Sequence, residues 1–287
     1  MSSKIILGTA QFGLNYGINN KRGKIPEKEV FEILDYCRRV NISILDTAHD
    51  YGGSEKIIGN FIRNKRVNFK IISKLPTSCL GNIKNYLRAS LQNLNIKKLY
   101  GYLIHDFNSF LREPKILSLL RKYKEKGLIK NIGFSIYHPK ELEYLFKNNI
   151  DFDIIQLPYS IFDQRFAPFF SQLQEKEVKL YTRSVFLQGL VFKKMDKFGN
   201  QFKKLKKRLV ILRNLAQKMD ISISALCLNF VCLNKYIDKI LIGINNLDNL
   251  KEDAAALRYL NRVKDIYDDL LVLKEDDEKI ISPLNWK

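Results

Sequence analysis

A two-part unit recurs along the whole chain: a short β-branched run ending in polar or glycine residues, then a longer segment with helical periodicity. Eight strands are expected, at residues 5–9, 43–46, 70–73, 100–105, 131–134, 154–157, 180–183 and 239–243. These runs are apolar throughout rather than alternating, as parallel strands covered by helices on their outer face should be. The pattern predicts an α/β fold, a single-domain (β/α)8 TIM barrel over residues 1–287.

The segments between the strands predict the helices. Pro26 opens the first, with Glu27 and Glu29 in its first turn, and Val30 and Ile33 on one apolar face. Further helices are expected at residues 54–64, 80–94, 114–126, from 138 onward, 163–175, 204–219, 222–234, 246–260 and 263–273, with an insert at 185–202. The rival architecture is a doubly wound open sheet. No Gly-x-Gly-x-x-Gly follows the first strand, which argues against a dinucleotide-binding sheet of that type.

The charge balance is strongly basic, with a formal net charge of +19. The lysines are dispersed along the chain and cluster only between Phe192 and Leu209, where no RNA-binding aromatic motif or helix-turn-helix pattern accompanies them. A nucleic-acid partner is therefore not expected. A positive field that attracts a phosphate-bearing cofactor is the more modest use of this charge.

The cysteines Cys37, Cys79, Cys227 and Cys232 show no spacing typical of a zinc site, so we expect reduced thiols and no metal centre. The N-terminal apolar stretch is too short for a signal peptide, and no window approaches the roughly 18 apolar residues of a membrane span. The sequence therefore predicts a cytoplasmic protein without a membrane partner.

Ionisable side chains collect where three neighbouring strands end. Asp46 and Tyr51 follow the second strand, Lys74 the third, and His105 the fourth. The carboxyl ends of barrel strands form one active-site face, so these groups should meet. A tyrosine has an ordinary pKa of about 10, and an ammonium group nearby would lower it toward the range useful for proton transfer. Since none of the four groups is a hydride donor, a cofactor would have to supply hydride.

The string Asp46-Thr47-Ala48-x-x-Tyr51-Gly52 resembles the signature of the aldo-keto reductase family, and Lys74 and His105 match the other two members of its tetrad. The resemblance runs from Gly8-Thr9-Ala10 to Glu252. It implies an oxidoreductase that uses NADP(H), or alternatively NAD(H), to interconvert an aldehyde, ketone or sugar hemiacetal and its alcohol. It also implies that Tyr51 is the general acid/base. The N-terminal hairpin that plugs many members is missing here, because the first strand begins almost at Met1.

The resemblance also assigns the cofactor contacts. Ser135 and Gln156 match the residues that hold the carboxamide, and Tyr181 falls where the family stacks an aromatic ring on the nicotinamide. The remaining candidates are Thr9, Arg183, Gln188, Gly189, Gly243, Asn245, Glu252 and Asp253. Arg183 is considered for a phosphate contact, and Asp253 stands where the family usually has Asn. No cation follows the eighth strand until Lys251. The expected preference for NADP therefore rests on the cofactor that is usual in the family and on the positive net charge of the chain.

The expected partner is a small carbonyl or sugar substrate, with Phe12, His49, Asp106 and Phe107 as candidate contacts and Phe186 as another possible wall. Two other functions remain open. One is a catalytically silent, nucleotide-binding regulatory protein on the same fold. The other is a cofactor-free aldolase or isomerase that forms a Schiff base on Lys74. The complete tetrad favours the oxidoreductase.

Overall fold

The computed structural model describes residues 3–18, 20–77, 81–194, 198–199 and 202–286. Eight parallel strands close into a barrel in sequence order, because β1 pairs with both β2 and β8. The strands are β1 (Ile5–Gly8), β2 (Ile44–Asp46), β3 (Lys70–Leu75), β4 (Leu99–Ile104), β5 (Ile129–Ser135), β6 (Ile154–Pro158), β7 (Lys179–Arg183) and β8 (Lys239–Ile242). Every strand ends within two residues of its predicted bounds, so the predicted barrel is confirmed.

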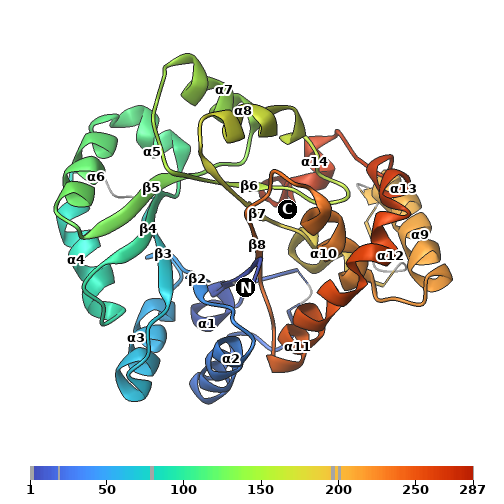
Figure 1. The fold of residues 1–287 in the computed structure, drawn as a ribbon, viewed down its shortest axis with the longest axis horizontal. Coiled ribbons are helices and arrows are strands. Elements are labelled where there is room, and N and C mark those ends of the chain that lie inside the picture. Colours follow the sequence, from blue (N-terminus) through green and yellow to red (C-terminus); the bar gives the residue numbers. More distant parts are fainter. Residues whose placement is uncertain (1–2, 19, 78–80, 195–197, 200–201, 287) are drawn as a thin grey trace.

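Helices surround the barrel on its outside (Figure 1). The first long one, α2, follows Pro26 and buries Val30, Ile33, Leu34 and Cys37 on the predicted face. The α-helices are α1 (Ala10–Gly13), α2 (Glu27–Arg39), α3 (Ser54–Lys65), α4 (Ile83–Asn93), α5 (Phe107–Arg112), α6 (Lys115–Glu125), α7 (Pro139–Lys147), α8 (Phe170–Glu175), α9 (Lys203–Lys218), α10 (Ile223–Leu233), α11 (Leu247–Ala256), α12 (Leu260–Lys264), α13 (Tyr267–Leu271) and α14 (Glu278–Ile281). Short 3-10 turns occupy η1 (Ala167–Phe169), η2 (Leu187–Phe192), η5 (Leu257–Tyr259) and η6 (Pro283–Asn285). Cys79 and the predicted helix start at Leu80 lie outside the described residues.

Two helix predictions need correction. The helix expected at 163–175 is α-helical only from Phe170. The amides of Phe162 and Asp163 donate to Ser160 Oγ in a turn, and residues 167–169 form the 3-10 turn η1, where Pro168 has no amide to donate. The helix expected at 263–273 is divided into α12 and α13. The short helices α1, α5 and α14 were not predicted, and their four to six residues give little periodic signal.

The barrel has two separate apolar cores. One fills the space between strands and helices. The other is an inner core of inward-facing side chains: Ile6, Ile44, Ile72, Leu103, Ile154 and Tyr181, with Tyr100 and Leu241 packed against it. Side chains alternate between the two faces of a strand, so the residue two positions after an inward-facing residue also faces inward. Adding two to the positions of the inner core therefore gives an upper layer nearer the carboxyl ends of the strands: Gly8, Asp46, Lys74, His105, Gln156, Arg183 and Gly243. The polar groups therefore lie directly above an apolar floor.

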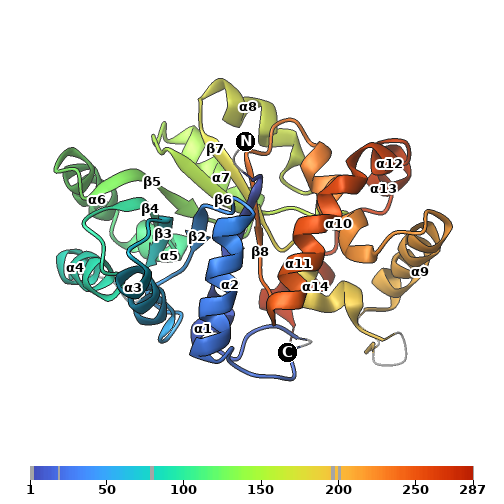
Figure 2. The same cartoon turned by 60° about the horizontal axis from the view of Figure 1, so that its bottom comes forward.

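Figure 2 shows the two ends of the barrel: the N-terminus lies at one end, and α1, α14 and the C-terminal end of the described chain lie at the other. That second end is the mouth, where the strands finish. No single helix among the described residues is long and apolar enough to cross a membrane. By length and composition alone, the bent pair α9 and α10 passes that test together, with an angle of 96° between the helices.

Candidate active site

In the upper layer, Lys74 and Gln156 both donate hydrogen bonds to the carboxylate of Asp46. Lys74 Nζ donates to Asp46 Oδ1 and, at 3.0 Å, to the carbonyl oxygen of Thr47. Gln156 Nε2 donates to the other Asp46 oxygen at 2.8 Å. All three side chains are buried, so each oxygen of the Asp46 carboxylate has a fixed donor. A buried ion pair with additional hydrogen bonds is rigid, and losing one partner would leave an uncompensated charge.

Tyr51 lies over this ion pair and next to His105. Lys74 Nζ is 5.2 Å from the centroid of the Tyr51 ring, and the Tyr51 and His105 rings meet edge to face with their centroids 5.9 Å apart. The four residues predicted from the strand ends are therefore neighbours in space.

The electrostatics of Tyr51 differ from the expectation. The pKa of Tyr51 is raised, first by burial and then by the Asp46 carboxylate, and Arg183 is the cation that opposes the increase. The prediction that Lys74 lowers this pKa is wrong for this structure, because the Lys74 charge is paired with Asp46 and lies against the ring. Tyr51 is consequently held in its protonated form at neutral pH.

His105 is held neutral. Burial, followed by the charges of Lys74 and Arg183, lowers the pKa of His105 to about 3. Its Nδ1 is buried without a hydrogen-bond partner among the described residues, and the nearest carboxylate oxygen, Asp50 Oδ2, is 3.9 Å away. A neutral imidazole can donate or accept a hydrogen bond without adding charge to the site.

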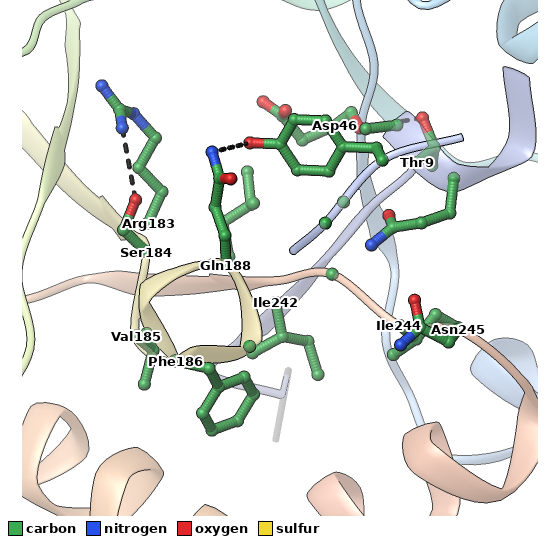
Figure 3. A pocket seen from close by; sticks show the side chains of 18 of the residues that line it. Thr9, Asp46, Arg183, Ser184, Val185, Phe186, Gln188, Ile242, Ile244 and Asn245 are labelled. Atoms are coloured by element: carbon green, nitrogen blue, oxygen red, sulfur yellow. Dashed lines mark hydrogen bonds between the residues drawn. The ribbon is translucent and has the colours of Figure 1, made fainter. Parts of the chain in front are cut away.

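One cavity of about 440 Å³ opens from these groups (Figure 3). At one end it reaches Asp46, Tyr51 and His105, and at the other it reaches Asn245, Glu252 and Asp253 beside α11. Its walls therefore extend from members of the predicted tetrad at the strand ends to polar residues beside α11.

Two loops close over the middle of the cavity. Gln188 Nε2 donates to the Tyr16 hydroxyl at 2.9 Å, and the Ile18 amide donates to the Gln188 carbonyl at 3.2 Å. Ser184, Leu187, Gln188 and Gly189 all have positive φ, between 46° and 89°, which curls the loop after β7 toward the loop after β1. Left-handed backbone at three non-glycine residues is costly and is typical of functional sites.

The model of the aldo/keto reductase family matches residues 4–268 of the chain, which is nearly its whole length. The chain belongs to the aldo/keto reductase family. This reductase is accordingly an NAD(P)-dependent oxidoreductase, as the tetrad led us to predict.

Known proteins of similar sequence and fold agree with this membership. The reductase is 23% identical over 277 residues to the uncharacterized oxidoreductase YqkF of Bacillus subtilis, covering 87% of this chain and 89% of that protein. It is 31% identical over 150 residues to D-arabinose 1-dehydrogenase of Saccharomyces cerevisiae, covering 47% and 43%. In fold it is similar to an aldo-keto reductase of Bacillus halodurans in its holo form, with a TM-score of 0.73, 20% identity and 92% of each chain covered.

The structure brings most of the predicted cofactor residues of the reductase to the cavity. Its walls include Thr9, Ser135, Gln156, Arg183, Gln188, Gly189, Gly243, Asn245, Glu252 and Asp253. Tyr181 is the exception: it belongs to the inner core, and its hydroxyl lies 3.3 Å from that of Tyr100. Because Tyr181 is one inward position below Arg183 on β7, Arg183 and not Tyr181 faces the cavity.

The four candidate substrate contacts do not line the cavity in the described structure. Phe12 and Phe107 are buried in the outer core. The Asp106 carboxylate caps α5 by accepting from the amides of Asn108 and Ser109. His49 packs edge to face on Tyr86, with the centroids 5.0 Å apart. These four residues are not part of this wall, so their role as substrate contacts stays a prediction, whereas Phe186 does lie on the wall.

Several wall residues were missed from the sequence. They come from the loops and from the C-terminal segment: Tyr16, Gly17, Asn20, Tyr137, Ser184, Ser224, Asn249 and Pro283. Tyr137 follows directly on the predicted strand end at Ser135, so its position next to a strand end was an available signal. The contact of Tyr16 with Gln188 depends on the folded loop and has no signal in the sequence.

The charged form of the Asp253 carboxyl, at the α11 end of the cavity, is disfavoured. Burial, and then the neighbouring Glu252, raise the pKa of Asp253 to about 7. The folded state keeps a proton that the unfolded chain loses near pH 4, so stability falls as pH rises from about 4 to about 7. We expect Asp253→Asn to melt at a higher temperature than wild type, by a margin that widens across this range and is constant above it.

Thermal unfolding of both proteins between pH 4 and pH 8 measures this margin. Asp248→Asn, at an exposed position of the same helix, is the matched control and should show no such widening. A margin for Asp253→Asn that is the same at every pH would contradict the assignment.

Proposed function

We propose that this protein reduces an aldehyde or ketone with hydride from NADPH, and that Tyr51 donates the proton to the carbonyl oxygen. The supporting observation is that one cavity is lined both by Tyr51 and His105 and by residues of α11 and of the loop before it. Tyr51 and the residues matched to cofactor contacts therefore face one continuous space.

The wall residues fit a nicotinamide dinucleotide. Gln156 and Ser135 are partners in the β5–β6 register, and Ser135 Oγ is 3.5 Å from Gln156 Oε1. This long contact leaves the Gln156 oxygen able to accept a hydrogen bond from a carboxamide, while Asp46 fixes the amide nitrogen. When bound, the nicotinamide supplies the hydride.

The reacting groups of the chain have separate tasks in the proposed reaction. Tyr51 carries its proton at neutral pH and acts as the acid in the reduction direction. Because its pKa is raised, it gives up the proton only as the carbonyl oxygen becomes alkoxide-like on accepting hydride. His105, neutral, positions the carbonyl oxygen by a hydrogen bond. Lys74, fixed by its ion pair with Asp46, lies over the face of the Tyr51 ring and positions it.

The direct test is to assay the protein with NADPH and a panel of aldehydes, ketones and aldoses. Turnover is measured as the loss of NADPH absorbance. Aldoses are included because the yeast relative is named D-arabinose 1-dehydrogenase. We expect turnover of at least one reactive aldehyde. Tight NADPH binding without turnover of any member would contradict the proposed activity and favour a nucleotide-binding regulatory role.

The preference for NADPH gains support from Arg22. This arginine of the loop after β1 donates to the Asn245 carbonyl at 3.0 Å and pairs with Glu29 at 2.9 Å. It brings a cation to the start of α11, where the local sequence has none before Lys251. Such a cation is suited to the 2′-phosphate of NADP.

We expect Arg22→Gln to weaken NADPH binding about 3- to 10-fold, the effect of one exposed charge contact, and to change NADH binding by less than about twofold. Fluorescence titration with each cofactor measures this. Lys251→Gln is the control, because Lys251, like Arg22, is an exposed cation in an ion pair near the start of α11. If only Lys251→Gln weakened NADPH binding, Arg22 would not be the phosphate ligand. Equal affinity of wild type for both cofactors would contradict the NADPH preference.

A further inference from the structure

Arg183 stands in the same inward layer as Asp46, His105 and Gln156. It is the last residue of β7, opposite Pro158 in register, while Gln156 is opposite Tyr181. Arg183 is therefore one inward position nearer the mouth than the Gln156–Tyr181 level. It lines the cavity at the end where Tyr51 and His105 lie.

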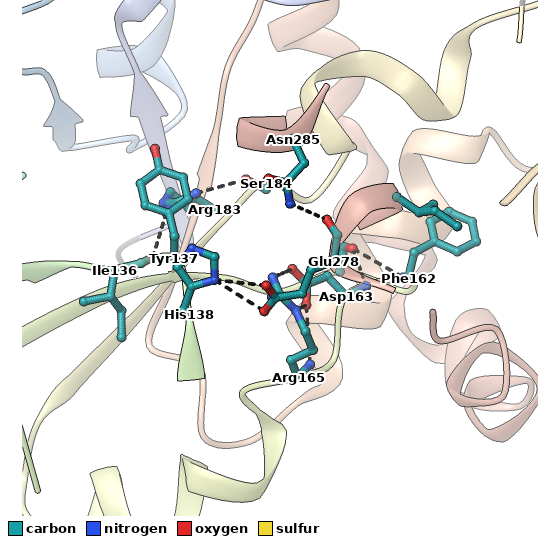
Figure 4. Close-up of polar contacts among 12 residues, drawn as sticks. Ile136, Tyr137, His138, Phe162, Asp163, Arg165, Arg183, Ser184, Glu278 and Asn285 are labelled. Carbon is teal, nitrogen blue, oxygen red and sulfur yellow. Dashed lines mark hydrogen bonds and ion pairs between the residues drawn. The ribbon is translucent and has the colours of Figure 1, made fainter. Parts of the chain in front are cut away.

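The guanidinium is fixed in direction (Figure 4). It stacks on the Tyr137 ring with its carbon 3.9 Å from the centroid, and Nη2 donates to the Ile136 carbonyl at 2.7 Å. Nη1 donates to Ser184 Oγ at 3.3 Å. Ile136 and Tyr137 follow β5, so the group turns to that side of the mouth. Asn245 and Glu252 follow β8, on the other side of β7.

The charge of Arg183 has no carboxylate partner among the described residues. The acidic groups nearby are used elsewhere: Asp46 pairs with Lys74, and Asp163 and Glu278 pair with Arg165 (Figure 4). Arg183 Nε is buried and has no hydrogen-bond partner in the described part of the chain. A guanidinium has five N–H donors, and two of them are used by Ile136 and Ser184.

The upper layer consequently carries one carboxylate and two cations, with His105 neutral. The field of Arg183 reaches the reacting groups, since it opposes the raised pKa of Tyr51 and contributes to the lowered pKa of His105. A half-buried cation without a counter-ion at a reacting site favours an anionic ligand, which a planar guanidinium binds well.

We propose that Arg183 selects carbonyl substrates that carry a carboxylate or phosphate group, with Tyr137 as its positioning residue. The proposal rests on the reductase activity proposed above. It replaces the sequence-based hypothesis that Arg183 contacts a cofactor phosphate, because the guanidinium is directed to the β5 side, away from the α11 end of the cavity.

Two pairs of aldehydes of matched shape test the selection: 4-formylbenzoate against its methyl ester, and glyceraldehyde 3-phosphate against glyceraldehyde. We expect wild type to favour the anionic member of at least one pair by about 10- to 100-fold in kcat/KM, the range of a charge-assisted hydrogen bond. The pair with the larger ratio identifies carboxylate or phosphate as the preferred anion.

Arg183→Met should bring that ratio close to one, mainly through a higher KM for the anionic aldehyde. Any effect of the lost charge on Tyr51 and His105 should change kcat for both members of a pair alike and so leave the ratio as the readout. Tyr137→Leu should reduce the ratio in part, and Tyr137→Phe, which keeps the ring, should preserve it. Lys122→Met, on the exposed face of α6, removes one charge remote from the cavity and controls for global electrostatics.

Equilibrium binding distinguishes an Arg183 that holds the substrate anion from an Arg183 that holds the cofactor. Calorimetric binding of 4-(hydroxymethyl)benzoate to the protein saturated with NADP should be lost in Arg183→Met, even if the wild type reduced no aldehyde in the panel. NADPH affinity should stay within about twofold. A large loss of NADPH affinity with equal losses for charged and neutral aldehydes would overturn the proposal and assign Arg183 to the cofactor. No preference of wild type for either anion would also overturn it.

Discussion

Tyr51→Phe is expected to lower kcat for carbonyl reduction by about 10²- to 10⁴-fold, the usual contribution of a general acid, while NADPH affinity changes less than about twofold. Phenylalanine keeps the ring that contacts Lys74 and His105 and removes only the hydroxyl proton. Since the defect lies in the chemical step, single-turnover rates should fall as much as steady-state rates.

Tyr16→Phe is the matched control for Tyr51→Phe. Tyr16 also lines the cavity, but its hydroxyl accepts from Gln188 and is separate from the Asp46–Lys74 pair. Its loss should affect cofactor affinity more than the chemical step. Retention of more than about a tenth of wild-type kcat by Tyr51→Phe would remove Tyr51 from the role of proton donor.

Lys74→Met should give the largest loss of stability of any single change in the site. It leaves the Asp46 carboxylate buried with only Gln156 as donor, and breaking a buried pair in this way costs about 3–5 kcal/mol. Denaturant unfolding measures the loss, and kcat should fall with it because Tyr51 loses the group against which it packs.

The double variant Lys74→Met/Asp46→Asn separates the two effects. Removing both charges should recover most of the lost stability, because an ion pair replaced by neutral groups of similar volume is often near neutral in cost. Activity should stay low. Recovery of activity together with stability would mean that the ion pair supports the fold alone and not the position of Tyr51.

The barrel and the tetrad could be predicted from the sequence because both depend on local patterns. Each strand contains a short apolar run, and Asp46, Lys74 and His105 lie at or close to the carboxyl ends of their strands. The alternation of inward- and outward-facing side chains along β7 could also have been read from the sequence. It identifies Arg183 as the cavity-facing residue, whereas the family resemblance favoured Tyr181, which belongs to the apolar floor.

Other features of the site could not be predicted, because they depend on contacts between distant segments. The Tyr16–Gln188 hydrogen bond joins residues 172 positions apart, and the left-handed Ser184 and Leu187 have no local signal such as glycine. The raised pKa of Tyr51 was missed because it comes from burial and from the Asp46 carboxylate, and both depend on the folded state.

The apolar floor of the barrel restricts where protons can come from. Ile44, Ile72 and Leu103 lie one inward position below Asp46, Lys74 and His105, and these floor side chains are at most 3% exposed. Within the described residues, the side-chain polar groups of this floor are the hydroxyls of Tyr100 and Tyr181, which lie 3.3 Å from each other and are not bonded to the upper layer. A Tyr51 that has given up its proton must therefore recover it from water entering at the mouth. Substrate passes through that same opening, so a bound molecule would delay the recovery until it leaves.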